Sequence, residues 1–227
     1  MMSFSYVLYL FGGILTVLAA LMLIPLAVAG VTGEIALAGA FAGAASGTAF
    51  FGVGLMLGLR DARPHHRMRD AVLLVFLAWF IAPCFAALPL FEARGIGQLT
   101  NVIFESVSAL TTTGATTIDD VDSEYRSVLA WRAVLQWAGG LGTIVMGAAI
   151  VSALGFLALP VYKPTVQSIE RLSVLERLGP FFRYLLPPYA GLALAGFVVL
   201  WMSGLPRFEA FCLALSAVST GGFSISN

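Results

Sequence analysis

Residues 104–117 read FESVSALTTTGATT, and this stretch decides the fold of the chain. Its serines, threonines and glycine lie between long apolar segments. Polar groups are costly at membrane depth unless they line water, an ion or other protein. A degenerate copy, CLALSAVSTGGFSI, follows at residues 212–225. At an offset of 108 positions Gly114 aligns with Gly222 and Thr112 with Thr220, which indicates an internal repeat.

The composition predicts an all-α integral membrane protein. Of the 227 residues, 59% are hydrophobic and 11% are charged, whereas soluble domains carry about 25% charged residues. The apolar runs have the length of spanning helices rather than of barrel strands. Five spanning segments are expected, at residues 4–29 (interrupted by Pro25), 35–59, 71–91, 128–159 and 187–204, the last opened by Pro187 and Pro188.

Two further apolar stretches, 99–110 and 208–218, are too short to cross a membrane. Each follows a spanning segment and precedes a Ser/Thr/Gly loop, which predicts a re-entrant half helix and loop. A dehydrated cation needs oxygen ligands in place of water, and backbone carbonyls supply them in selectivity filters. Glycine accepts the backbone angles that turn successive carbonyls the same way. The alternative, a simple turn at the membrane surface, is disfavoured because the pattern occurs twice.

The expected organisation therefore has five parts. They are an N-terminal transmembrane hairpin (1–59), a basic loop (60–70), a first pore repeat (71–159), a linker (160–184) and a second, incomplete pore repeat (185–227). Each repeat has the order helix, pore helix, filter, helix, and the second stops after its filter.

The distribution of charge predicts the orientation. If both loops face one side, eight of the twelve Lys and Arg residues lie on the other side, in the two links. The positive-inside rule then places the links and the N-terminus in the cytoplasm. Eight of the twelve acidic residues lie on the loop side, including Asp119, Asp120 and Asp122. This excess of acid suggests a vestibule that concentrates cations, although exposed loops are often simply charged.

Three stretches together resemble the TrkH/KtrB-type potassium-uptake family: SALTTTGATTIDD, WRAVLQWAGGLGTIV and FEAFCLALSAVSTGGFS. The resemblance implies four such repeats around one pseudo-fourfold pore, with K⁺ as the transported ion and no organic cofactor. It implies a multi-pass protein of the inner (cytoplasmic) membrane, a cytoplasmic nucleotide-binding gating subunit, and a homodimer of the full-length protein. Nucleic acid is not an expected partner. The implied potassium-binding residues are Thr112, Thr113, Gly114, Ala115, Thr220, Gly221, Gly222 and Phe223.

One departure from the family pattern affects the function. The chain holds one complete repeat and most of a second, so a truncated product or a fragment is expected, supplying two of four filter loops. Assembly of two chains and a non-conducting remnant stay open. Arg132 and Gln136, four residues apart, are weaker candidates that either brace a loop or anchor the helix at the interface.

The main rival function is a Mg²⁺-dependent intramembrane enzyme that uses Asp119, Asp120 and Asp122. Aspartate-rich prenyltransferase motifs carry an acid at the fifth position, where this chain has Ser123, and a second acidic cluster is missing from the sequence. We therefore expect a transporter and not an enzyme.

Overall fold

The computed structural model describes residues 4–62, 68–153 and 178–224, and every regular element in these ranges is helical. The N-terminal part holds α1 (Phe4–Leu21), α2 (Leu23–Thr32) and α3 (Ile35–Gly58). The next group comprises α4 (Met68–Phe76), the π-helix η1 (Leu77–Ile81), α5 (Ala82–Ala87), α6 (Leu90–Arg94), the 3₁₀ helix η2 (Ile96–Gln98) and α7 (Leu99–Leu110). The last group comprises α8 (Arg126–Ala153), α9 (Leu178–Met202) and α10 (Arg207–Val218).

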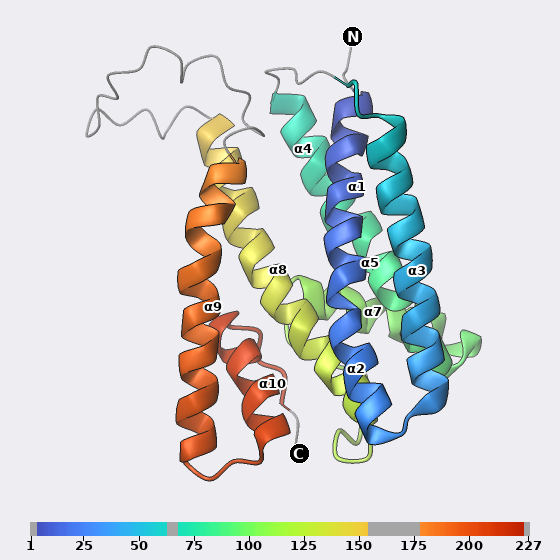
Figure 1. Cartoon of the computed structure of the whole chain (residues 1–227), viewed down its shortest axis with the longest axis vertical. Coiled ribbons are helices and arrows are strands. Elements are labelled where there is room, and N and C mark those ends of the chain that lie inside the picture. The colour runs from blue at the N-terminus through green and yellow to red at the C-terminus, as the bar shows by residue number, and fades with distance from the viewer. Residues whose placement is uncertain (1–3, 63–67, 154–177, 225–227) are drawn as a thin grey trace.

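Helix α8 crosses the molecule obliquely and separates two groups of helices (Figure 1). On one side α1 and α3 pack together as a hairpin, with α4 and α5 beside them. On the other side α9 packs against the short helix α10, and α10 also contacts α8. The two short helices, α7 and α10, lie in the same half of the molecule, toward the turn between α2 and α3 (Figure 1). The arrangement therefore brings both Ser/Thr/Gly loops beside α8.

Five segments are long and apolar enough to cross a membrane, as the sequence predicted. They are Phe4–Thr32, Ile35–Gly58, Arg69–Ala87, Arg126–Gly147 and Arg183–Met202. The twelve-residue helices α7 and α10 are too short to do so, because about twenty residues are needed. The chain is a multi-pass, all-helical membrane protein.

Three prolines lie at other positions within their helices than the sequence predicted. The first segment breaks at a turn at Met22 rather than at Pro25, which lies in the first turn of α2. A proline there removes no helical hydrogen bond. Helix α9 starts at Leu178 and carries Pro187 and Pro188 in its interior, so the expected start at residue 187 was wrong. Long membrane helices tolerate prolines because neighbouring groups satisfy the freed carbonyls.

The last residues of both expected links belong to helices. Residues 178–184 of the expected linker belong to α9, and its residues 160–177 lie outside the described residues. Met68, Arg69 and Asp70 of the expected basic loop form the first turn of α4, and its residues 63–67 also lie outside the described part. Asp70, taken as an exposed loop residue, is only 2% exposed.

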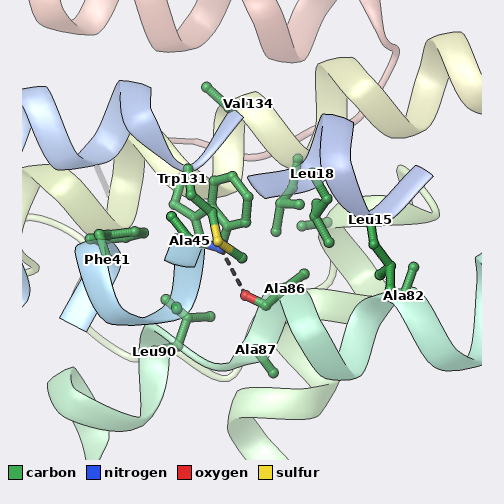
Figure 2. Packing of buried hydrophobic residues seen from close by; sticks show 14 of the residues in the cluster. Leu15, Leu18, Phe41, Ala45, Ala82, Ala86, Ala87, Leu90, Trp131 and Val134 are labelled. Carbon is green, nitrogen blue, oxygen red and sulfur yellow. Dashed lines mark hydrogen bonds between the residues drawn. The ribbon is translucent and has the colours of Figure 1, made fainter. Parts of the chain in front are cut away.

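Trp131 anchors α8 to the N-terminal helices. Its side chain is fully buried, and its Nε1–H donates a hydrogen bond to the carbonyl of Ala86, 2.9 Å away (Figure 2). The indole meets the ring of Phe41 edge-on, with centroids 6.1 Å apart. A buried aromatic with a satisfied polar atom contributes both area and orientation. This contact therefore sets the height and rotation of α8 relative to α3 and α5.

Glu34, in the turn between α2 and α3, caps the start of α8. Its carboxylate accepts hydrogen bonds from the backbone N–H of Arg126 (3.0 Å) and of Ser127 (3.2 Å), and from the Ser127 hydroxyl. The first N–H groups of a helix have no partner within the helix, and a negative charge there also interacts favourably with the helix dipole. The hairpin thus contacts the first two turns of α8, at Ser127 through Glu34 and at Trp131 through Phe41.

We predict that Glu34→Ala lowers the unfolding free energy by about 1 kcal/mol, the typical cost of a lost N-cap. Thermal unfolding of the purified protein in detergent measures the change. Thr32→Val is the matched control, because Thr32 bonds only to carbonyls of its own helix, at Val28 and Ala29. Equal melting temperatures for the two variants would contradict the capping role.

Candidate functional site

The two short helices end in the same way. Both have twelve residues, and their bounds differ by the 108 positions that relate the two sequence copies. At the end of α7 the N–H of Thr111 donates to the carbonyl of Val107 (2.8 Å). At the end of α10 the N–H of Ser219 donates to the carbonyl of Leu215 (3.2 Å). The repeat read from the letters is therefore also a repeat of local structure.

Each loop folds back on its own helix through one serine. In the first loop, residues 111–117, the backbone carbonyl of Ser108 accepts from the N–H of Thr113 (2.9 Å), and the Ser108 hydroxyl donates to the carbonyl of Ala115 (2.6 Å). One serine thus restrains the loop at two points. The bond from Ser108 to Ala115 closes a turn of seven residues and uses no group from another helix.

The second loop, residues 219–224, repeats this arrangement. The carbonyl of Ser216 accepts from the N–H of Gly221 (2.9 Å), and the Ser216 hydroxyl donates to the carbonyl of Phe223 (3.3 Å). Serine suits both positions because a single hydroxyl can donate to the returning chain while its backbone continues the helix.

The loops share an unusual backbone. Thr112 and Thr220 have φ of 57° and 53°, and Gly114 and Gly222 have φ of 74° and 73°. Among the described residues these two threonines are the only non-glycine residues with positive φ. The left-handed region costs an ordinary residue roughly 1–2 kcal/mol, and a β-branched residue is a marked outlier there. Strain kept at the same place in both copies points to a functional constraint.

The two loops also contact each other. A Cβ placed on Gly114 would fall inside van der Waals contact with the carbonyl oxygen of Gly221. A Cβ on Gly221 would in turn collide with the amide group of Gln136. Glycine at these two positions is required by space as well as, at Gly114, by φ. The loops therefore form one continuous patch of backbone beside α8.

A buried carboxylate holds the far end of the first loop. Glu105 on α7 is 1% exposed, and its Oε1 accepts from the Thr116 hydroxyl (2.8 Å), the Thr117 hydroxyl (3.1 Å) and the Thr117 backbone N–H. Its Oε2 lies 3.1 Å from Nε of Arg132 on α8. Opposite charge and several donors together offset the cost of burying the carboxylate.

Arg132 and Gln136 connect α8 to the second loop. The guanidinium carbon of Arg132, which is 2% exposed, lies 3.9 Å from the centre of the Phe223 ring. Gln136, one turn further along α8 and fully buried, donates from Nε2 to the carbonyl of Gly221 (2.6 Å). The weaker candidates of the sequence analysis thus brace the loops and do not anchor an interface.

The buried pair corrects the charge assignment made from the sequence. Glu105 and Arg132 are two of the charges counted on the loop side, and both are buried inside the protein. Their charges cancel, so the excess of acid on that side is unchanged. Glu105 was not recognised as a site residue. The available signal was an ionisable residue inside an apolar half helix, which by default indicates function.

Two adjacent glycines let α8 approach both loops. A Cβ on Gly139 would overlap the backbone of Leu110, at the end of α7. A Cβ on Gly140 would collide with the Tyr189 hydroxyl and with Ser219, at the start of the second loop. Tyr189 on α9 donates to the carbonyl of Trp137 (3.1 Å). The segment 131–140 of α8 therefore contacts the second loop directly and the first loop's supporting helix at Leu110 and Glu105.

The structure brings the eight sequence-predicted residues together in this patch. Three of their carbonyl oxygens accept a hydrogen bond from a side chain, namely those of Ala115, Gly221 and Phe223. A carbonyl oxygen has two lone pairs, so these bonds restrain its direction and leave one acceptor position. Thr113, Ala115, Thr220 and Gly222 are exposed, whereas Gly221 and Phe223 are buried. The patch therefore combines carbonyl oxygens held by side chains with backbone that is accessible at the surface.

The acidic cluster lies apart from these contacts. Asp119, Asp120 and Asp122 are exposed in the loop between the first Ser/Thr/Gly loop and α8. Asp120 accepts through Oδ1 from the N–H of Asp122 (3.2 Å). In the described part of the chain, His, Cys, Asp and Glu side chains form no group of three or more that could hold a metal ion.

Comparison with known proteins adds independent findings. Residues 40–227 match the model of a family described as "TrkH: Cation transport protein". The chain is 33% identical over 175 residues to the Trk system potassium uptake protein TrkH of Vibrio parahaemolyticus, covering 75% of this chain and 36% of that protein. It is 35% identical over 160 residues to the Trk system potassium uptake protein TrkG of Escherichia coli, covering 70% of this chain and 33% of that protein.

A solved structure resembles nearly the whole chain. The crystal structure of the potassium transporter TrkH from Vibrio parahaemolyticus superposes with a TM-score of 0.84 at 30% identity, covering 99% of this chain and 45% of that one. The chain thus spans about a third of the length of these curated relatives and less than half of the solved one.

We predict that Gly139→Ala lowers the unfolding free energy by roughly 1–3 kcal/mol, the usual range for overpacking a tight contact. The added methyl group must push α7 away from α8. Gly142→Ala is the matched control on the same helix, because nothing lies within 4 Å of its Cβ position. That variant is expected to be neutral or slightly stabilising. Equal losses in chemical denaturation would contradict the close approach at Gly139.

Proposed function

Because the chain belongs to the TrkH family of cation transport proteins, we propose that it takes part in potassium uptake by supplying two of the four loops of a selectivity filter. The relatives named above are potassium uptake proteins. The single observation that carries the proposal is the doubled loop, in which left-handed residues recur at positions 112 and 114 and again at 220 and 222.

Potassium recognition by these loops would follow from carbonyl chemistry. An ion that sheds its water is stabilised where oxygens replace the hydration shell, and rings of backbone carbonyls do this in potassium filters. We assign the ligands to residues 112–115 and 220–223. The C-terminal ends of α7 and α10 precede the loops, so the negative ends of both helix dipoles are directed toward a bound cation. Side-chain bonds to Ala115 and Phe223 limit the collapse of the loops around a smaller ion.

The surrounding charge supports an outward-facing filter in the cytoplasmic membrane, with the N-terminus in the cytoplasm. Asp119, Asp120 and Asp122 are exposed next to the first loop, where they would raise the local cation concentration, most strongly at low salt. Four of the twelve Lys and Arg residues lie on the loop side, and one of these, Arg132, is buried. The exposed Lys and Arg residues are therefore concentrated even more strongly on the opposite side, as the positive-inside rule requires. A cytoplasmic nucleotide-binding gating subunit and a homodimer of the complete transporter are part of the same proposal.

Two loops enclose only part of a fourfold filter. The match to 45% of the solved Vibrio chain supports the view that the remaining loops come from further sequence or from a second chain. The alternative function is a non-conducting remnant.

Potassium flux in liposomes tests the proposal. Two preparations are compared: the 227-residue chain, and its fusion to the part of the Vibrio TrkH protein that follows the matched region. We expect the fusion to carry K⁺ in preference to Na⁺. Flux through the chain alone would indicate assembly of several copies. Flux through neither, with both proteins correctly folded in the bilayer, would overturn the transport proposal and favour the remnant.

We predict that Gly114→Ser in the conducting preparation reduces the preference for K⁺ over Na⁺ by about tenfold or more, because a serine side chain displaces the neighbouring Gly221 carbonyl. Measured permeability ratios report the change. Gly33→Ser is the control. Gly33 has a similar φ of 77°, with nothing within 4 Å of its Cβ position, so it carries the same strain outside the two loops. An unchanged ratio for Gly114→Ser would count against the filter assignment.

A further inference from the structure

We propose that Arg132 is a positioning residue that couples the two loops, so that they become ordered as one unit rather than independently. This coupling deepens the proposed function. It rests on that function only in that the two loops are taken to be filter strands. The observation is that one guanidinium group lies 3.1 Å from the carboxylate that supports the first loop and also lies over the ring of Phe223 in the second loop.

On the first loop, the contact runs through Glu105. The carboxylate accepts three hydrogen bonds from Thr116 and Thr117 and pairs with Arg132 at 3.1 Å. Removing the guanidinium, or rotating it, would leave a buried carboxylate without its counter-charge, which is strongly unfavourable. The order of residues 116–117 therefore depends on where the guanidinium lies.

On the second loop, the contact is the Phe223 ring, 3.9 Å from the guanidinium carbon. Both partners are buried, and a desolvated cation–π contact is stronger than an exposed one. The same residue is tied to α10 through its carbonyl, which accepts from Ser216. A movement of the ring therefore moves the second loop, and the guanidinium is in contact with the part of the loop that moves.

The two sequence copies differ at the position of Glu105, and this difference explains why both loops depend on Arg132. Leu213 stands where the 108-residue offset places the counterpart of Glu105. The second loop consequently lacks a carboxylate of its own at that position and depends on α8. Arginine suits the shared position because its planar guanidinium can bind a carboxylate along one edge and stack on an aromatic face at the same time.

Close packing explains why a shift in one loop should be transmitted to the other. The guanidinium, the carboxylate and the ring are each at most 7% exposed, and packed interiors transmit small shifts instead of absorbing them. Coupling between two sites is also reciprocal, so a change in either loop must affect the other. Gln136 strengthens the same face of α8 by holding the Gly221 carbonyl.

Amide hydrogen exchange of the full 227-residue chain in lipid nanodiscs tests the coupling. The first variant is Phe223→Leu, which removes the ring but keeps the buried ion pair and so avoids the folding problem that an uncharged residue at position 132 would create. We expect exchange to accelerate about threefold or more in the first loop, at Thr117 and its neighbours, as well as in residues 219–224. Acceleration confined to residues 219–224 would overturn the proposal.

The reciprocal variant is Glu105→Gln, read at residues 219–224. Ser108→Ala is its matched control, because Ser108 lies on the same helix and supports the same loop through Ala115. We expect both variants to accelerate exchange in the first loop, and only Glu105→Gln to accelerate it in the second. Equal effects of the two variants on the second loop would mean general loosening and would contradict a specific role for Arg132.

The exchange measurement requires no ion flux. An absence of potassium flux in liposomes would therefore refute the proposed function. The coupling between the loops would still be tested by the hydrogen-exchange result. Conversely, flux together with purely local exchange effects would support the proposed function and refute the coupling.

Discussion

The buried contact of Arg132 with Glu105 and Phe223 is the interaction on which the loop region depends. It places two opposite charges and an aromatic ring in an apolar interior, where an unpaired charge would be strongly destabilising. The ends of both loops are therefore tied to one side chain of α8. Thr116 and Thr117 complete the coordination of the carboxylate, so that both threonine hydroxyls have a partner within the protein.

Helix α8 can serve both loops because the N-terminal hairpin holds it in place. Trp131 precedes Arg132 directly and is locked between α3 and α5 by its contacts with Phe41 and Ala86. Glu34 binds the first turn of the same helix. The glycines at 139 and 140 then allow α8 to lie directly against the loop ends. The hairpin is thus a structural support for the loops although it contributes no residue to them.

Strain in the loops has a cost that these supports offset. Two threonines are held at positive φ, and this conformation lowers the stability of the fold by roughly 1–2 kcal/mol for each of them. The serine bonds at 108 and 216, the carboxylate of Glu105 and the amide of Gln136 hold the backbone in this form. A loop that is ordered before an ion arrives needs little rearrangement to bind it. Such order is the property expected of a filter.

Length, hydropathy and the repeated letters determined the membrane class, the five spans, the two short helices and the pairing of the loops, because these depend on local pattern alone. The tertiary structure decided what lies between elements. The Glu105–Arg132 pair joins residues 27 positions apart, and the Gln136–Gly221 bond joins residues 85 apart, so neither leaves a local signal. The start of α9 was mispredicted for the opposite reason: Pro187 and Pro188 suggest a helix start locally, whereas both lie inside the helix that begins at Leu178.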